Sequence, residues 1–570
     1  MNNVTSVLPA VLPRQTPQVR TVEPVRRRPA WHLPALTVAI MTPLYGLWAW
    51  LLATGGYDLA AQLAWAGFAH RHPGAPYSMS WYGGMHTMNY SVLTPSLMAY
   101  AGVRTVSVVA GLVATWAMTA LIVGSGVRRP VLPALLGAVC LWCDVASGRT
   151  TFAVGVAFGL LALRRLRSAP DRWAVAALLA ALTAAASPVA ALFLWVAGAG
   201  LLAARRPVAA AAAVLPPLLV LGAVWLLFPF AGVQPIGAAT TVCPLVTSVA
   251  LVVAAPRSWR TVRAGAVAYA LGTVLTACVD SPVGTNVERL AGIAGLPLLA
   301  AALSERWDQW RRERRLFTRR PGVRGPLAVR GPLATGVVLV AVLAAALGDN
   351  GYWLLDKTVG DLRVSVPVPG WATHTDGVAG ALRRLHADRH RVEVVPARNH
   401  RESTVFAGVV QTARGWNRQL DVERGRLFYD GTFSAAAYRE WLDEWAVAYV
   451  VLPHGLMDGP GRAEAALLAP AARPGWLRPV WHDAYWTVFA VARPAPMATA
   501  PASVRRAGEA ELTVRLPAAG STVVKVVWSP WLRAPGACVR PAGRWTRITA
   551  PAAGDYRLYT IYRRAHGSCR

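Results

Sequence analysis

The sequence predicts an α-helical polytopic membrane domain of about 11 spans, followed by an extracytoplasmic α/β domain and a β-sandwich domain. The first observation is composition: 55% of the residues are hydrophobic and only 15% are charged, whereas a soluble domain carries about 25% charged residues. The second is placement, because only six acidic residues precede Ser304, whereas acids and arginines are common after Asp349. The third is that long apolar runs recur between residues 34 and 348, and such runs are typical of membrane spans.

The expected spans are apolar runs close to the roughly 20 residues that cross a bilayer. The pair around Ser187 and Pro188 is short, so the span count stays open by one pair there. The first run follows an arginine-rich tail, residues 1–33, and lacks a small-residue cleavage site behind it, which favours an uncleaved anchor. The expected spans are 34–54, 104–124, 131–147, 150–164, 172–187, 189–204, 207–227, 239–256, 264–280, 289–304 and 333–348.

Arginines between the runs predict the orientation. With the N-terminus inside, 25 arginines fall on inner segments and four fall on outer loops and their flanks. Positive charge collects on the cytoplasmic side of membrane proteins. We therefore expect a multi-pass plasma-membrane protein with a cytoplasmic N-terminus and an extracytoplasmic C-terminal part. Almost all of the positive charge behind the net charge of +30 is arginine, and much of it lies in such loops, so nucleic acid is not expected as a partner.

The C-terminal part has two patterns. Residues 349–496 alternate helical segments such as SAAAYREWLDEWA with strand-like runs such as VAYVVLP, which predicts an α/β domain. Residues 497–570 contain period-two runs broken by Gly and Pro, which predict a small β-sandwich. Cys538 and Cys569 fall there and an oxidising compartment allows them to pair, but the sequence does not fix the connectivity.

The first outer loop, residues 55–103, is too long to be a turn and holds the first candidate site. Asp58 follows the first span directly, where a carboxylate can take a proton from a hydroxyl or hold a divalent cation. Alternatively, Asp58 only caps the helix that follows it. The loop is also rich in aromatic and hydrogen-bonding side chains, which suit either sugar binding or an interfacial belt. The candidates are Trp81, Tyr82, His86, Asn89 and Tyr90.

This arrangement resembles the GT-C membrane glycosyltransferases, which use polyprenyl-phosphate-linked sugars as donors. The shared features are many spans, a long first outer loop with an acid after the first span, and an outer domain. The paired acids often found in GT-C first loops are absent, since Asp58 stands between Tyr57 and Leu59. Several stretches also resemble a group of actinobacterial membrane proteins, namely SWYGGMHTMNYSVLTPSLMA, SGRTTFAVGVAFGLLAL, PVGTNVERLAG and ARGWNRQLDVERGRLFYDGTF.

The resemblance implies transfer of a sugar from a polyprenyl-phosphate donor to a cell-envelope glycan acceptor, with Asp58 as general base. It implies that Arg149 and Arg289 bind the donor phosphate, because a guanidinium meets phosphate with two parallel hydrogen bonds. Alternatively, these arginines anchor helix ends at lipid headgroups. A divalent cation remains a candidate cofactor without an assigned ligand set. Four more polar residues at this membrane face are expected to shape the acceptor site: Asp144, Asp280, Asn286 and Glu288.

Two other classes of function stay open. A transporter would place polar groups near the middle of the bilayer, whereas the acids here cluster at one surface. A non-catalytic envelope-assembly protein would act through its outer domain. In that domain, the segment ARGWNRQLD (residues 413–421) is either a site for a glycan or anionic polymer or a structural turn. We find no P-loop, GxSxG elbow or zinc signature, so nucleotide-driven chemistry is not expected.

Overall fold

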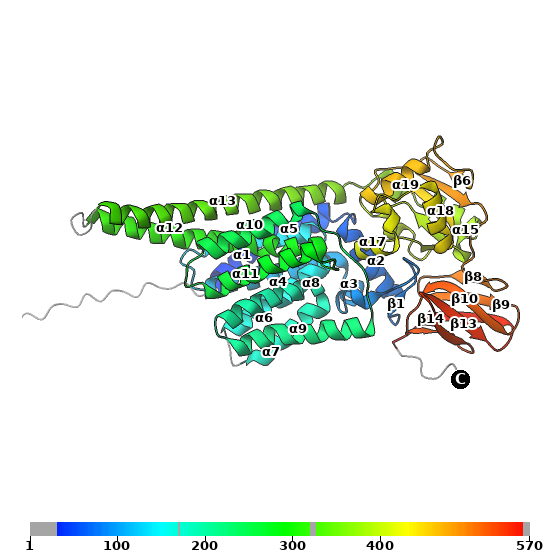
Figure 1. The fold of residues 1–570 in the computed structure, drawn as a ribbon, viewed down its shortest axis with the longest axis horizontal. Helices are drawn as coiled ribbons and strands as arrows, with labels where there is room; N and C mark the ends of the chain where they lie inside the picture. The colour runs from blue at the N-terminus through cyan, green and yellow to red at the C-terminus, as the bar shows by residue number, and fades with distance from the viewer. Residues whose placement is uncertain (1–30, 169–171, 320–325, 563–570) are drawn as a thin grey trace, which may run out of the picture.

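The computed structural model describes residues 31–168, 172–319 and 326–562. It is mostly helical, at 59%. One elongated bundle of helices, the helical unit, carries an α/β domain and a β domain side by side at one end (Figure 1). The predicted N-terminal tail up to residue 30 and Cys569 lie outside the described residues.

Each predicted span falls on a helix of the helical unit. Within the described residues, six helical segments are long and apolar enough to cross a membrane, and four shorter apolar helices accompany them. The helices are α1 (His32–Leu47, continued by the π-helix Trp48–Leu52), α4 (Val103–Gly124), α5 (Val131–Ala146), α6 (Thr150–Ser168), α7 (Trp173–Ala186), α8 (Pro188–Ala203), α9 (Pro207–Leu227), α10 (Ala238–Ala254), α11 (Arg260–Cys278), α12 (Leu296–Arg319) and α13 (Pro326–Ser365).

The short pair of helices around Ser187 has a local cause. The Ser187 hydroxyl accepts a hydrogen bond from the Ala190 backbone N–H at 3.4 Å, so Ser187 is the N-cap of α8. Pro188 then occupies the first position of α8, where its missing N–H costs nothing. Helical backbone geometry is disfavoured for Ser187, because this residue precedes a proline, and α7 therefore ends at Ala186.

The loop 55–103 is folded and lies between the helices and the C-terminal domains. The Tyr77 hydroxyl donates to the Val527 carbonyl at 2.7 Å, and the Met79 N–H donates to the Glu509 carbonyl at 2.6 Å. The loop is therefore part of the domain interface. Its elements are α2 (Asp58–Arg71), β1 (Tyr77–Ser78), β2 (Met85–His86), the 3₁₀ turn Thr87–Asn89 and α3 (Thr94–Ala101).

Helix α13 joins the helical unit to the α/β domain. It has 40 residues, which corresponds to about 60 Å at 1.5 Å per residue. The sequence predicts a span that ends at residue 348, but the helix continues to Ser365. The added part carries charged side chains to the C-terminal domains, where the candidate site lies.

The α/β domain is built on a five-stranded mixed sheet with strand order β4-β3-β5-β7-β6. Strand β3 is parallel to β4 and β5, whereas β7 is antiparallel to β5 and β6. Separate apolar clusters around Trp371 and Tyr438 pack against it. The strands are β3 (Arg391–Val394), β4 (Gln411–Thr412), β5 (Val447–Pro453), β6 (Leu477–His482) and β7 (Trp486–Val491). The α-helices are α14 (Gly370–Thr373), α15 (Asp376–Arg384), α16 (Glu402–Val405), α17 (Arg418–Arg424), α18 (Ala435–Glu444) and α19 (Arg462–Leu467).

The β domain consists of two antiparallel sheets, with strand orders β10-β13-β12 and β11-β14-β9-β8. Alternate residues of β9, such as Leu512 and Val514, are buried in a core that both sheets share with Ile548. Cys538 on β12 is disulfide-bonded. The strands are β8 (Ser503–Ala507), β9 (Glu511–Leu516), β10 (Gly520–Val527), β11 (Leu532–Arg533), β12 (Cys538–Ala542), β13 (Trp545–Ala550) and β14 (Gly554–Thr560).

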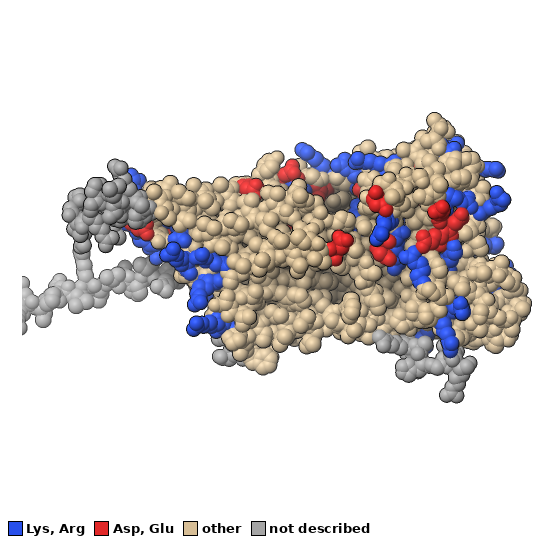
Figure 2. All heavy atoms as spheres, viewed as in Figure 1, with Lys and Arg blue, Asp and Glu red and all other residues tan. Residues whose placement is uncertain are grey.

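Charge is distributed unevenly along the molecule. Figure 2 shows Lys and Arg side chains gathered at the end of the helical unit away from the C-terminal domains, and few charges along the middle. We name the end of the helical unit away from the C-terminal domains the arginine-rich end, and the end beside those domains the domain-facing end. An apolar band between two polar ends is the pattern expected of helices that sit in a bilayer.

Candidate functional site

Seven charged side chains meet at the domain-facing end of the helical unit. We name this group the charged cluster, and it contains five residues that the sequence analysis singled out. They come from the loop 55–103, from α5 and the turn after it, from the segment before α12, and from α13. The members are Asp58, Asp144, Arg149, Glu288, Arg289, Lys357 and Asp361.

Asp58 is positioned by its neighbours on both sides. Tyr57 has a positive φ of 57°, its N–H donates to the Asn399 carbonyl at 2.6 Å, and its carbonyl accepts from the Trp416 indole at 2.9 Å. Gly148 packs so closely on α2 that an added Cβ would lie 2.7 Å from the Leu59 nitrogen. A glycine is therefore needed at 148, and the close approach brings the turn before α6 next to Asp58.

Arg149 lies at the centre of the charged cluster, surrounded by three carboxylates. Its Nη2 donates to Asp361 Oδ2 at 3.1 Å, its Nε lies 3.5 Å from Asp58 Oδ2, and its Nη1 lies 3.6 Å from Asp144 Oδ1. Asp144 and Asp361 are buried. Because carboxylates surround its guanidinium, Arg149 is suited to orient acids and less suited to bind a phosphate.

Arg289 and Lys357 border the more open side of the charged cluster. The Arg289 guanidinium lies 3.9 Å from Asp58 Oδ2 and over the ring of Phe152, 5.3 Å from its centroid. Lys357 Nζ lies 2.8 Å from Glu288 Oε1. The side chains of Asp58, Arg289 and Lys357 are 25%, 21% and 39% exposed, so a ligand can reach one carboxylate and two cations together.

Tyr90 is the loop aromatic that joins this site. Burial is the main cause that raises its pKa to about 12, and the Asp58 carboxylate adds to that rise while Arg289 opposes it. The Tyr90 hydroxyl is 2.5 Å from Gln62 Nε2, and Gln62 Oε1 accepts from the Thr151 hydroxyl at 2.6 Å. This chain of hydrogen bonds keeps a neutral phenol beside Asp58 and Arg289.

The other loop candidates contact the C-terminal domains or neighbouring loops. The structure does not bring them to the charged cluster, and their contacts suit the alternative structural role. Trp81 packs on Trp65, and the Tyr82 hydroxyl donates to the Gly415 carbonyl at 2.6 Å. His86 Nε2 lies 2.9 Å from Ser529 Oγ, and Asn89 donates to the Pro229 carbonyl. Outside this loop, Asn286 donates to the Val283 carbonyl.

Lys357 and Asp361 are members of the charged cluster that the sequence analysis missed. They were missed because the last span was expected to end at residue 348. A signal was available in the segment LLDKTVGDLRVS. Its spacing of four residues places Lys357 and Asp361 on one face of a helix that extends beyond the apolar run.

The segment 413–421 is buried and supports the Asp58 loop. Arg414 donates from Nε and Nη2 to the two carboxylate oxygens of Asp421 at 2.9 and 2.8 Å, and from Nη1 to Glu464 at 3.2 Å. Burial is the main cause that raises the pKa of Glu464 to about 7. Trp416 stacks on His400 with ring centroids 3.5 Å apart. These contacts fit the structural interpretation of the segment, since Arg414 has little exposed surface.

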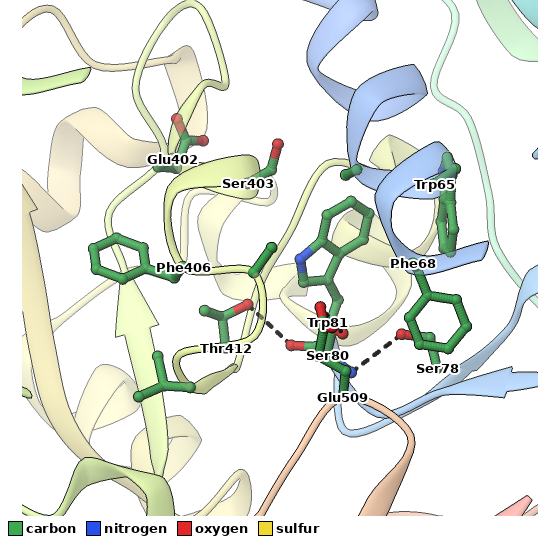
Figure 3. Close-up of a pocket in the computed structure, with 13 residues that line it drawn as sticks. Trp65, Phe68, Ser78, Ser80, Trp81, Glu402, Ser403, Phe406, Thr412 and Glu509 are labelled. Carbon is green, nitrogen blue, oxygen red and sulfur yellow. Dashed lines mark hydrogen bonds between the residues drawn. The ribbon is translucent and has the colours of Figure 1, made fainter. Parts of the chain in front are cut away.

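A small polar cavity lies beside this interface, between the loop 55–103 and the C-terminal domains (Figure 3). It has about 20 Å³, which is room for one water molecule. Trp65 and Glu402 line it, and each has a buried polar atom without a hydrogen-bond partner among the described residues. Ser80 and Thr412 join its walls through a 3.2 Å hydrogen bond. The cavity is too small for a sugar.

A far larger cavity, of about 700 Å³, lies inside the helical unit. Its walls come from α4, α6, α8, α10, α11 and α12 with the turn before it, and they are mainly apolar. Its volume lies in the range of about 300–1,000 Å³ typical of ligand sites, so the cavity is a second candidate binding site.

One comparison with known proteins bears on the C-terminal end. A family model described as a domain of unknown function, DUF8823, matches residues 499–569. This range covers strands β8 to β14, so the two-sheet unit is similar to a defined family domain. No curated protein matches the chain. Among the described residues, no group of three or more His, Cys, Asp or Glu side chains is arranged to hold a metal ion.

Proposed function

We propose that this protein is a membrane glycosyltransferase that transfers a sugar from a polyprenyl-phosphate donor to a cell-envelope acceptor on the outer face. The observation that carries the proposal is the position of Asp58 between the guanidinium groups of Arg149 and Arg289. A partly exposed carboxylate beside cations is what base-assisted transfer from a phosphate leaving group requires. Apolar helices beneath the site would admit a lipid-linked donor from the bilayer.

In the proposed reaction, the acceptor oxygen attacks the anomeric carbon while Asp58 takes the proton of the acceptor hydroxyl. The bond between the anomeric carbon and the phosphate oxygen breaks, and the lipid phosphate leaves with the electron pair. Attack opposite the leaving group inverts the anomeric carbon. Arg289, which lies beside Asp58, stabilises the departing phosphate, whereas the more exposed Lys357 binds the donor phosphate to the same extent before and during the reaction. In this proposal Arg149 orients Asp58, and the phosphate-binding role expected for Arg149 from the sequence passes to Lys357.

The proposal assigns no ligand to a divalent cation. The Arg149 guanidinium contacts Asp58, Asp144 and Asp361, which supplies these carboxylates with a counter-charge. The acceptor would approach between the charged cluster and the C-terminal domains. In the proposed orientation these domains lie outside the plasma membrane and position the cell-envelope glycan.

The test is a strain that lacks the protein, complemented with wild type, Asp58→Asn or Asp280→Asn. Asp280 is the matched control, because it is an exposed acid just after α11 that forms none of the ion pairs of the charged cluster, so its expected part in the acceptor site is tested at the same time. Envelope glycans and polyprenyl-phosphate sugars are profiled by mass spectrometry. We expect the deletion and Asp58→Asn strains to lose one linkage and accumulate one lipid-linked sugar, and Asp280→Asn to match wild type. An Asp58→Asn strain that matches wild type at normal protein levels contradicts the proposal and favours an envelope-assembly role.

A second candidate function is transport, and the large internal cavity favours it. The helices that line the cavity pack on one another, α4 on α6, α6 on α8, α8 on α11 and α11 on α10. Because its walls are mainly apolar, the cargo would be a hydrophobic molecule. Movement of a fluorescent lipid across proteoliposomes that contain the purified protein tests this candidate. A rate equal to that of protein-free liposomes rejects it.

A further inference from the structure

The large cavity of the helical unit has different chemistry at its two ends. Toward the domain-facing end its lining includes Phe193 and Leu290. Phe193 packs edge-to-face with the buried ring of Phe152, 5.8 Å between centroids, and the Arg289 guanidinium lies over the Phe152 ring. The two phenyl rings therefore separate the cavity from the charged cluster.

At the arginine-rich end the lining becomes polar. It includes Ser125, Arg128, Ser258 and Arg260, which lie at helix ends or in turns, and Glu305 within α12. The cavity thus reaches the surface of the helical unit at the end away from the C-terminal domains. A ligand that enters there meets polar groups first and hydrocarbon beyond them.

The charges at this mouth favour an anion. The Arg128 guanidinium is 3.9 Å from Glu305, which neutralises one arginine. Arg260 is exposed, and no acid of the described chain lies within 4 Å of its guanidinium. Arg306 extends the positive charge beside the mouth and donates to the carbonyls of Ala254 and Ala255 at the end of α10. The mouth therefore carries net positive charge.

Water is poorly suited to the body of the cavity. A buried water needs about three polar partners, whereas the walls between the two ends are mainly alanine, leucine, glycine and valine. The Ser248 hydroxyl lines the cavity and has no hydrogen-bond partner among the described residues. The volume of about 700 Å³ lies in the range of about 300–1,000 Å³ typical of ligand sites. Hydrocarbon is the occupant that the walls favour.

We propose that this cavity binds an anionic phospholipid from the leaflet at the arginine-rich end, with its phosphate at Arg260 and acyl chain between α4, α8 and α11. In the proposed orientation this is the inner leaflet. The site is separate from the charged cluster, so the inference does not depend on glycosyl transfer. The bound lipid would fill the centre of the helical unit and fix the spacing of its helices.

The experiment measures lipids that stay with the purified protein. Full-length protein is purified in mild detergent, and its lipids are identified by native mass spectrometry and counted after extraction. Wild type is expected to retain about one anionic phospholipid per chain. Arg260→Ala is expected to lower the ratio of anionic to zwitterionic lipid about tenfold, whereas Arg205→Ala, an exposed arginine at the same end outside the cavity lining, leaves the ratio unchanged.

Two variants on α8 separate the cavity from the lipid annulus around the protein. Ala197 lines the cavity and Ala199 does not, so Ala197→Phe is expected to expel the lipid and Ala199→Phe to retain it. If Ala197→Phe does not fold, as judged by gel filtration, Ala294→Phe fills the cavity from the opposite wall. Retained lipid in a folded cavity-filled variant overturns the proposal. So does co-purification of a polyprenyl phosphate in place of a phospholipid, because the cavity would then serve the donor.

Discussion

Arg149 Nε lies 3.5 Å from Asp58 Oδ2, and this pair joins the start of α2 to the turn that precedes α6. Arg149 also contacts Asp144 and Asp361, so a single guanidinium joins three separate segments: the start of α2, α5 with the turn after it, and α13. The geometry of Asp58 therefore depends on residues that do not touch a substrate.

Replacement of Arg149 tests this dependence. Arg149→Ala leaves three carboxylates close together with only Arg289 beside one of them, Asp58, and loss of one partner from a buried ion group costs about 3–5 kcal/mol. We expect a marked fall in melting temperature, and a smaller fall for Arg149→Lys, which keeps the charge but lacks the planar fork. Differential scanning fluorimetry in detergent measures both, with Arg205→Ala as the control. Equal melting temperatures for Arg149→Ala and the control would show that the cluster does not hold these segments together.

Lys357 is expected to affect donor binding more than turnover. Its ammonium group is the most exposed cation of the charged cluster, and a contact made equally in the ground state and the transition state changes KM and leaves kcat unchanged. Lys357→Ala should raise KM for the lipid-linked donor about tenfold, and Lys357→Arg should restore most of the loss. Arg363→Ala is the control on the same helix, since Arg363 is exposed. A purely structural role for Lys357 would instead lower kcat and protein stability together.

Arg401 is expected to fasten the α/β domain to the helical unit. Its guanidinium donates to the carbonyl and hydroxyl of Thr54 and, at 2.7 Å, to the carbonyl of Ser365. Loss of these charged hydrogen bonds should lower the free energy of local opening at the two junctions by about 3 kcal/mol. Arg401→Ala should therefore speed hydrogen–deuterium exchange at both junctions, whereas the exposed neighbour Arg398→Ala should not. Unchanged exchange in Arg401→Ala would place the fastening contact elsewhere.

The stability of the α/β domain is expected to fall as pH rises from about 4.5 to about 7. Burial raises the pKa of Glu464 from 4.5 to about 7, against the opposing charge of Arg414. The folded state therefore binds more protons than the unfolded state in this window, and stability declines with rising pH. Asp421 has the opposite effect on stability, because Arg414 lowers the pKa of its carboxyl against the effect of burial. The stability that the ionised Asp421 contributes is lost only when the pH falls below about 4.

Glu464→Gln isolates this effect, because glutamine keeps the size and does not titrate. Chemical denaturation of the full-length protein at several pH values should show a shallower decline between pH 4.5 and 7 for the variant. Glu440→Gln is the control, since Glu440 lies on the surface of α18. The same slope in wild type and Glu464→Gln would assign the pH dependence to another group.

Hydropathy predicted where the helices lie because each span must bury about 20 apolar residues. It failed at α13, which continues to Ser365 after its apolar run ends, because contacts with the C-terminal domains take over from lipid. Asp58, Arg149 and Arg289 were found because charges at the ends of apolar runs are conspicuous. The contact between Trp416 and Tyr57 could not be found, since it joins distant segments through tertiary packing alone.

The most direct test of the central claim is a transfer assay with purified protein in liposomes. The donor is the lipid-linked sugar that accumulates in the strain lacking the protein, and the acceptor is the envelope glycan isolated from that strain. The account predicts transfer by wild type and Asp280→Asn, and a loss of at least about 100-fold in kcat for Asp58→Asn. Wild-type transfer by folded Asp58→Asn would contradict the account, because the base would then be another residue.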